Sequence, residues 1–394
     1  MHTESWIEAE LAALRRDGLL REPRTWGEAG GWTTDADGHR VMNLASNDYL
    51  DLARHPRVVA AAREALETYG AGAASSRLVS GTLELHTRLE ARLAAHKGYP
   101  AALVTASGYA ANAGVIPALL PERTDALFAD RLAHASLLDG ARQSHAALHR
   151  FRHNDPEHLR ELLARHGAGP GRRLVVTESV FSMDGNLAPL AEIAAVTTAA
   201  GAMLLVDEAH ATGIFGPAGG GRVRELGLTG AVNLGMGTLS KGLGSLGGVL
   251  ACSAPMREWL VNRHRGFIYS TALPPAAAGA ALGALDVLEA EPDRGARLRR
   301  QAAAFRDRLR AAGFDTGASA SPIIPVMVGD PQRTVALARR LLAEHHILAA
   351  AIRPPTVPAG TSRLRLSVTL AHTPEALDQA ATALTTAARQ EGVL

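Results

Sequence analysis

Residues 202–209 read AMLLVDEA, a short apolar run that leads into Asp207 and Glu208. A run of this length and composition predicts a strand that is buried on both faces, as in a parallel sheet. Similar apolar runs recur along the chain, at residues 101–107, 125–130, 172–179, 232–237 and 247–253. Helical stretches such as 155–165 and 189–200 separate some of them. This alternation predicts an α/β fold with a large, mostly parallel sheet covered by helices on both faces.

The rest of the chain predicts an N-terminal arm and a second, smaller domain. Apolar periodicity over residues 5–20 predicts an amphipathic helix, and prolines and glycines interrupt the segment that follows. We therefore expect an N-terminal helix and arm over residues 1–55 and a large domain over residues 56–290. Beyond that point predicted helices (294–312, 331–344, 374–391) alternate with predicted strands (322–327, 363–369). This pattern predicts a small C-terminal α/β domain over residues 291–394.

The composition argues against several classes of protein. Of the 394 residues, 47% are apolar and 20% are charged, which is typical of a soluble globular protein. The net charge of +2 and the lack of a dense basic block argue against a nucleic-acid partner. No long apolar run or export-signal pattern occurs, so we expect no membrane association. The single cysteine, Cys252, is typical of a reducing compartment, and we expect a cytoplasmic protein.

Lys241 lies in a run of small residues, Thr238-Leu-Ser-Lys241-Gly-Leu-Gly-Ser-Leu-Gly247. A lysine that attacks a carbonyl carbon must lose its proton and reach that carbon without obstruction. Small neighbours allow a flat cofactor to approach the backbone closely, and Thr238 could donate its hydroxyl to a phosphate. Taken alone, the run is more often a glycine-rich surface turn.

Two nucleotide-binding motifs are formally present, and we reject both. Residues 242–247 match G-x-G-x-x-G, but they precede a predicted strand instead of opening a helix. The sequence Asp207-Glu-Ala-His210 resembles a helicase box, yet the chain contains no G-x-x-x-x-G-K-[ST] phosphate loop.

Asp207 ends a predicted strand, so its carboxylate should lie at the carboxyl end of the sheet, where open α/β sheets bind ligands. An aspartate there can pair with a protonated pyridine nitrogen, and His210 could donate to a phenolic oxygen. An acidic helix cap is the commoner meaning of such an aspartate. Its position 34 residues before Lys241 favours the cofactor interpretation.

Three further segments follow predicted strands. Ser107-Gly108-Tyr109 opens a helix, where backbone N–H groups can bind a phosphate. His134 offers a flat imidazole that could stack on a cofactor ring, although a structural histidine is the commoner meaning. Glu178 and Ser182 lie beyond another strand end, and Ser182 could reach a cofactor oxygen.

Taken together, these segments resemble a known family. TLSKGLGSLG, VDEAHATG and TESVFSMDG resemble the cofactor segments of class II pyridoxal-phosphate enzymes. With NDYLDL (47–52), SGYAAN, LAHASLLDG (132–140) and RHNDPEHL (152–159), they resemble the α-oxoamine synthases from about Arg21 to His372. The resemblance implies the aminotransferase fold type I, pyridoxal 5′-phosphate as cofactor, and a homodimer with its site at the subunit interface.

The resemblance also implies residue roles. Lys241 would bond covalently to the cofactor, Asp207 would face the pyridine nitrogen, and His134 would stack on the ring. The remaining residues fall into four groups: His210 and Ser182 near the phenolic oxygen; Gly108, Tyr109 and Thr238 at the phosphate; Arg21 and Thr356 at the substrate; Asn47 and Arg365 at the amino-acid carboxylate. Ser270 and Thr271 would reach the partner's phosphate, and no metal site is implied.

Residues 352–366, IRPPTVPAGTSRLRL, are similar to the family members that serve biotin biosynthesis. This resemblance implies decarboxylative condensation of L-alanine with a pimeloyl thioester of coenzyme A or of a carrier protein. Three alternatives stay open: glycine C-acetyltransferase or another α-oxoamine synthase, an aminotransferase of the same fold, and an inactive ligand-binding homologue.

Overall fold

The computed structural model describes residues 4–394, and contacts within the chain divide it into two compact units. Unit 2 comprises residues 47–182 and 186–300. Unit 1 comprises the described residues up to Ser46, residues 183–185 and residues 301–394. No helix among the described residues is long and apolar enough to cross a membrane.

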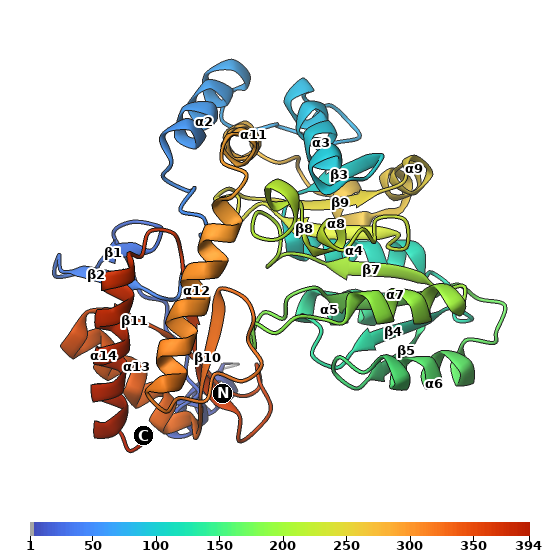
Figure 1. The fold of residues 1–394 in the computed structure, drawn as a ribbon. Helices are drawn as coiled ribbons and strands as arrows, with labels where there is room; N and C mark the ends of the chain where they lie inside the picture. The colour runs from blue at the N-terminus through green and yellow to red at the C-terminus, as the bar shows by residue number, and fades with distance from the viewer. Residues whose placement is uncertain (1–3) are drawn as a thin grey trace. The chain divides into compact units, whose positions relative to one another are not determined.

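Unit 2 is built on a seven-stranded sheet (Figure 1). Its strands run in the order β3 (Ala101–Thr105), β9 (Gly248–Cys252), β8 (Leu234–Thr238), β7 (Met203–Asp207), β6 (Arg173–Glu178), β4 (Ala126–Asp130) and β5 (Ala147–Phe151). The strands from β8 to β5 are parallel, and β9 is antiparallel to both of its neighbours. The predicted α/β fold with a large, mostly parallel sheet is confirmed.

Helices cover both faces of this sheet, because successive strand residues point to opposite sides. Leu205 of β7 belongs to the cluster that includes α4 (Gly108–Leu119) and α5 (Ala135–Gln143). Leu204 and Val206 belong to the opposite cluster, which includes α6 (Pro156–His166) and α7 (Leu190–Ala199). All three side chains are fully buried. A strand that is apolar on both sides therefore fits its place in the middle of the sheet.

The remaining helices of unit 2 follow or precede this sheet in sequence. They are α2 (Pro56–Tyr69), α3 (Glu84–Lys97), α8 (Arg222–Glu225), α9 (Ala254–Arg263), α10 (Arg265–Ile268) and α11 (Pro275–Ala290), with the 3-10 turn η1 (Pro217–Gly219). Figure 1 shows α2 beside α11. A Cβ on Gly279 of α11 would lie 2.5 Å from the carbonyl oxygen of Ala61 in α2. Glycine at this position permits the close approach of the two helices.

Unit 1 contains two three-stranded sheets. One runs β1 (Trp32–Thr34), β2 (Arg40–Asn43) and β11 (Ile347–Leu348), and the other runs β10 (Ile323–Gly329), β13 (Ser362–Ser367) and β12 (Ala350–Ile352). The unit also contains α1 (Ser5–Arg16), α13 (Pro331–His345) and α14 (Pro374–Gln390). The sequence did not predict β1, β2, β11 or β12, because each is at most four residues long and shows no clear alternation.

The first domain boundary differs from the expected one because the N-terminal segment pairs with the C-terminal one. The expected arm covers residues 1–55, whereas the structure groups only the chain up to Ser46 with residues 301–394. Strand β2 pairs with β11 in parallel register, and the amide of Met42 donates to the carbonyl of His346 at 2.8 Å. The N-terminal segment is therefore part of a sheet in unit 1.

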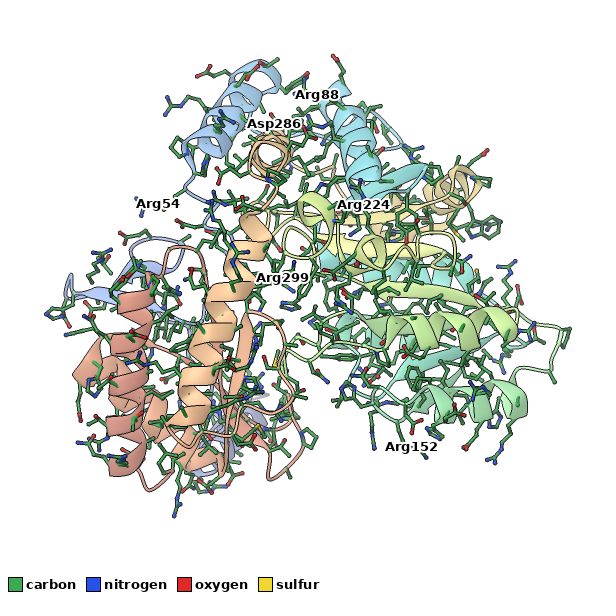
Figure 2. All side chains as sticks on the ribbon, in the orientation of Figure 1. Arg54, Arg88, Arg152, Arg224, Asp286 and Arg299 are labelled. Carbon is green, nitrogen blue, oxygen red and sulfur yellow. The ribbon has the colours of Figure 1, made fainter. Side chains whose placement is uncertain are left out.

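The second boundary lies at residues 300/301 instead of the expected 290/291, because the first turns of α12 (Arg294–Ala311) bond to unit 2. Arg294 donates to the carbonyl of Leu50 at 3.0 and 2.8 Å. Arg299, labelled in Figure 2, pairs with Glu225 at 3.1 Å. Long-range polar contacts of this kind leave no composition signal at the boundary itself.

His372 in unit 1 is buried in its neutral form. Its Nε2–H donates to the carbonyl of Gly31 at 2.9 Å, and its Nδ1 accepts the amide N–H of Thr369 at 3.1 Å. A protonated imidazole carries a hydrogen on both nitrogens, so its Nδ1 could not accept the amide N–H of Thr369. Burial lowers the pKa of His372 from 6.5 to about 4.

This histidine predicts a loss of stability in acid. Its pKa is lower in the folded state, so the unfolded state binds more protons below pH 6.5 and stability falls between pH 6.5 and about 4. The shift corresponds to a loss of ~3 kcal/mol across that range. We expect His372→Gln to be less stable than wild type at pH 7.5 but to lose ~2–3 kcal/mol less on acidification. Urea unfolding at pH 7.5 and 4.5 measures this, with the exposed His39→Gln as control; equal pH dependence in wild type and His372→Gln would contradict it.

Candidate active site

Five strand ends bring the predicted cofactor residues of unit 2 to one edge of the sheet. Strand β3 has the same direction as β8, because each is antiparallel to β9. The carboxyl ends of β3, β4, β6, β7 and β8 therefore share one edge. The residues that follow these ends are Gly108 and Tyr109 after β3, His134 after β4, Ser182 after β6, Asp207 and His210 at the end of β7, and Thr238 and Lys241 at the end of β8. Asn47, which the resemblance assigns to the amino-acid carboxylate, also belongs to unit 2.

Asp207 is held by donors on two sides. Its Oδ1 accepts the amide N–H of Ala209 at 2.8 Å, and its Oδ2 accepts the side-chain amide of Asn112 at 2.7 Å. Asn112, one turn into α4, also donates to Ser136 Oγ at 3.0 Å. A turn follows Asp207, so the alternative of an acidic helix cap is wrong.

Lys241 stands at the end of a chain of hydrogen bonds. Its Nζ lies 2.8 Å from His210 Nε2, and His210 Nδ1 lies 2.7 Å from the hydroxyl of Tyr49. Tyr49 donates its hydroxyl hydrogen to Asn47 Oδ1 at 3.1 Å, so its oxygen accepts from His210 Nδ1–H. In that tautomer the lone pair of Nε2 faces Lys241 and can take its proton.

Lys241 is one of only two lysines in the sequence. The other, Lys97, is fully buried and pairs with Glu208 at 2.8 Å, with a further bond to Thr212 at 3.3 Å. The second carboxylate oxygen of Glu208 accepts the amide of Val223 at 2.9 Å. Because Lys97 is buried and held in an ion pair, it cannot react with a carbonyl compound. Lys241 is therefore the lysine that can bond covalently to a cofactor.

His134 is the N-cap of α5 and has a defined tautomer. Its Nδ1 accepts the amide N–H of Ser136 at 3.2 Å and lies 2.7 Å from Ser136 Oγ. The proton of the neutral ring is therefore on Nε2. Burial lowers the pKa of His134; the charge of Asp207 opposes this shift, and that of Lys241 adds to it. The ring stays neutral and flat, which suits stacking on an aromatic cofactor.

The turn at Gly108 fits a phosphate. Ser107 caps α4 by accepting the amide of Ala110 at 3.1 Å, and the first turn of a helix presents N–H groups that suit an anion. A Cβ on Gly108 would lie 3.0 Å from Met236 Cε and 3.2 Å from Thr238 Oγ1, so glycine favours the close approach of this turn to β8. The side chain of Tyr109 is half exposed and donates to Asp139 at 2.5 Å. Tyr109 therefore offers its backbone to the turn.

Glu178 lies in register beside Asp207 on the neighbouring strand. Burial, and then the charge of Asp207, raises the pKa of Glu178 well above its ordinary value. A protonated Glu178 keeps two negative charges from meeting at this edge. Its Oε2 lies 3.2 Å from the amide nitrogen of Ser182, which places the Ser182 backbone at the same edge.

The predicted substrate residues of unit 1 form two pairs within that unit. Arg21 Nη2 donates to Thr356 Oγ1 at 3.2 Å, so two residues that the resemblance assigns to the substrate lie side by side although they are 335 positions apart. Arg365 is 5% exposed and donates to Ser367 Oγ at 2.9 Å.

Sequence reasoning missed four residues that position the others. Tyr49 orients His210, Asn112 and Ser136 connect Asp207 to His134, and Lys97 neutralises Glu208. Tyr49 and Asn112 stand inside the quoted motifs NDYLDL and SGYAAN, which is the only signal for them.

The unit 2 residues fit pyridoxal phosphate. Asp207 suits a protonated ring nitrogen, the Gly108 turn with Thr238 suits a phosphate, His134 suits the ring face, and Lys241 suits an aldehyde. The close approach of Gly108 to Thr238 Oγ1 brings a helix N-terminus and a hydroxyl group together, an arrangement that suits a phosphate.

Comparisons with known proteins agree with this geometry. The family model for class I and II aminotransferases matches residues 39–384. An 8-amino-7-oxononanoate synthase from Geobacter sulfurreducens is 48% identical over 390 residues, covering 98% of this chain and 99% of that protein.

Two solved structures show the same fold. A serine palmitoyltransferase variant from S. paucimobilis, with a bound PLP–myriocin aldimine, has a TM-score of 0.92 and 33% identity, covering 99% of this chain and 98% of that one. An 8-amino-7-oxononanoate synthase from Francisella tularensis has a TM-score of 0.76 and 28% identity, covering 89% of this chain and 99% of that one.

The hydrogen-bond chain from Lys241 predicts a role for Tyr49. We expect Tyr49→Phe to slow the reaction of Lys241 with added pyridoxal phosphate by at least about 10-fold at neutral pH, because His210 loses the partner that orients it. The deficit should shrink as the pH rises, since solvent then removes the lysine proton. Stopped-flow absorbance over a pH series measures both effects.

Tyr99→Phe is the matched control. Tyr99 is also buried, but its hydroxyl has no hydrogen-bond partner among residues 4–394, so its loss should leave the rate unchanged. Equal rates for Tyr49→Phe, Tyr99→Phe and wild type at every pH would show that Tyr49 does not assist Lys241 through His210.

Proposed function

The chain belongs to the class I and II aminotransferase family, and on that premise we propose a specific reaction for it. It is a pyridoxal-phosphate-dependent acyltransferase that condenses L-alanine with a pimeloyl thioester. The products are 8-amino-7-oxononanoate, the free thiol of the acyl carrier and carbon dioxide, as in biotin biosynthesis. The substrates are small molecules or, for the acyl group, a small carrier.

The observation that carries this proposal is the state of Lys241. It is one of two lysines, the other is closed in a buried ion pair, and its Nζ lies 2.8 Å from a histidine that can accept its proton. The identity of 48% to the Geobacter enzyme over nearly the whole chain supports the choice of substrates. The alternative of an inactive homologue does not account for these intact groups.

We assign a separate role in the reaction to each of the site residues. When bound, pyridoxal phosphate supplies an electron sink for the negative charge that develops on Cα of L-alanine. Asp207 stabilises the protonated ring nitrogen, and His134 holds the ring plane. Lys241 removes the Cα proton, and His210 lies beside Lys241 as a proton acceptor. Alanine Cα then bonds to the thioester carbonyl carbon, and the carrier leaves as its thiol. The alanine carboxylate departs as carbon dioxide, and a proton returns to Cα.

We further propose that the protein acts as a cytoplasmic homodimer. Cys252 is a free, buried thiol, which is consistent with a reducing compartment. Ser270 and Thr271 lie on an exposed stretch of unit 2, next to the exposed ring of Tyr269, and could meet a second copy of the chain.

A paired substrate assay tests the proposed reaction. We expect release of free thiol and carbon dioxide with L-alanine plus pimeloyl-CoA, and at least about 100-fold lower kcat/KM with glycine plus acetyl-CoA. Faster turnover of the glycine pair would identify a glycine C-acetyltransferase instead. Formation of pyridoxamine phosphate with 2-oxo acids would identify an aminotransferase.

A second candidate comes from the structural comparison. The serine palmitoyltransferase has the higher TM-score of the two solved structures, 0.92 against 0.76. The assay therefore includes L-serine plus palmitoyl-CoA. The 48% identity to the Geobacter enzyme, against 33% to the palmitoyltransferase, favours the pimeloyl reaction.

Lys241→Ala should abolish covalent attachment of the cofactor. After borohydride reduction with pyridoxal phosphate, we expect mass spectrometry to find the label on Lys241 of the wild type and on no lysine of the variant. Turnover should fall at least about 10²-fold, as expected for loss of a positioned base. Label on Lys97 would contradict the assignment.

Arg365→Ala should weaken binding of L-alanine and leave the absorption spectrum of the bound cofactor unchanged, because this guanidinium is assigned to the amino-acid carboxylate. A loss of ~1.5–3 kcal/mol is typical for a hydrogen bond to a charged group, so we expect at least about 10-fold weaker binding. Spectral titration with L-alanine measures the affinity, with Arg389→Gln as control. Unchanged alanine affinity would exclude the role.

A further inference from the structure

Three side chains that can ligate a metal ion meet in unit 1. Asp35, His39 and His346 each offer one ligand atom, and these atoms all lie within 4.8 Å of one another. Asp35 and His39 flank the turn between β1 and β2, and His346 lies between α13 and β11. Among residues 4–394 no other group of three histidine, cysteine or carboxylate side chains has this spacing. We call these three residues the His–Asp cluster.

Backbone hydrogen bonds bring the two segments of the cluster together. The amide of Met42, on β2, donates to the carbonyl of His346 at 2.8 Å, and β2 then pairs in parallel with β11. At the other end of β2, the amide of Asp35 donates to the carbonyl of His39 at 3.1 Å and closes the turn. The positions of the three residues are therefore set by the backbone and not by contacts among their side chains.

The carboxylate of Asp35 is oriented by the turn. Its Oδ1 accepts the amide N–H of Asp37 at 3.0 Å and that of His39 at 2.9 Å. Its Oδ2 lies 3.2 Å from His39 Nδ1. Two ligands of a tetrahedral zinc ion, with bonds of about 2.0–2.1 Å, lie roughly 3.3 Å apart. Oδ2 of Asp35 and Nδ1 of His39 thus already have the spacing of two zinc ligands.

His346 supplies the third ligand from the end of a helix. Its ring centroid lies 5.1 Å from that of His39, with 37° between the ring planes. Both rings are exposed, so small side-chain rotations can bring their nitrogens to a common ion. His346 is the C-cap of α13, and the carbonyl end of a helix carries a partial negative charge that favours a cation.

No arginine competes for the carboxylate, although the chain is rich in arginine. The nearest arginine in sequence, Arg40, places its guanidinium over the ring of Trp32, 4.3 Å from the ring centroid. Among residues 4–394, the ion-pair partner of Asp35 is the imidazole of His39. The cluster therefore combines one carboxylate with two imidazoles and contains no fixed cation.

We propose that the His–Asp cluster binds a divalent transition-metal ion of the zinc class. Two imidazole nitrogens and one carboxylate oxygen form a ligand set that zinc uses in proteins, with water in the fourth position. Calcium and magnesium prefer oxygen ligands, so the two imidazoles select against them. A bound ion would connect the β1–β2 turn to the end of α13 and stabilise unit 1. The proposal does not depend on the proposed function, because the predicted cofactor residues belong to unit 2.

Direct titration with zinc chloride tests the proposal. The enzyme carries no affinity tag, is loaded with pyridoxal phosphate and is freed of unbound cofactor before calorimetry at pH 7.5. We expect one zinc ion to bind per chain at micromolar concentration, and magnesium and calcium not to bind in that range. Saturating zinc should raise the melting temperature, because the ion binds the folded chain in preference to the unfolded one.

Substitution of each ligand should weaken binding. His39→Gln, His346→Gln and Asp35→Asn should each lower zinc affinity at least about 10-fold, since loss of even an outer partner of a metal ligand costs 10- to 100-fold. Without zinc, the two histidine variants should melt close to wild type, because both rings are exposed.

His166→Gln is the matched control. His166 is exposed and stacks on His149 with 4.1 Å between ring centroids, but this pair has no third ligand at metal-binding distance among the described residues. Its loss should leave zinc affinity and the melting shift unchanged.

Three results would overturn the proposal. Zinc could fail to bind the wild type at micromolar concentration, or His166→Gln could weaken binding as much as the cluster variants do. Alternatively, His346→Gln could bind zinc as tightly as wild type, which would show that Asp35 and His39 only stabilise their turn. Zinc binding is measured without substrates, so a failure of the proposed reaction would leave these results unaffected.

Discussion

The arrangement of unit 2 depends on the common direction of five strands in its sheet. Because β6, β7 and β8 are hydrogen-bonded in parallel, Glu178 and Asp207 lie in register, and Thr238 ends the next strand at the same edge. Each loop that leaves this edge carries one group of the site. The backbone pairing thus brings together side chains from residues more than a hundred positions apart, before any side-chain contact is made.

Buried charge is the second constraint on the fold. In unit 2 the buried carboxylates have donors: Asp207 has Asn112, Glu208 has Lys97, and Glu90 has Arg77 and Arg257. These pairings offset part of the desolvation cost that an unpaired buried charge would carry.

The chemistry of the site depends on the protonation states of its titratable side chains. Burial favours the uncharged forms of His134 and Glu178, because it lowers the pKa of the histidine and raises that of the carboxyl group. His210 lies between Tyr49 and Lys241, and its tautomer decides whether it gives or takes a proton. An amine that must lose its proton to react is therefore placed next to an acceptor instead of a second cation.

The sequence by itself determined the seven-stranded sheet in large part, the cofactor segments and the reactive lysine, because these depend on local patterns: apolar runs, glycine-rich turns and strand ends. The edge strand β5 escaped prediction, since most of its side chains are at least partly exposed. Only the tertiary structure decided the unit boundaries, because Arg294 and β2 make their contacts with distant segments. It also decided that Tyr49 supports His210 and that Lys97 is closed to reaction, since both depend on partners more than a hundred residues away.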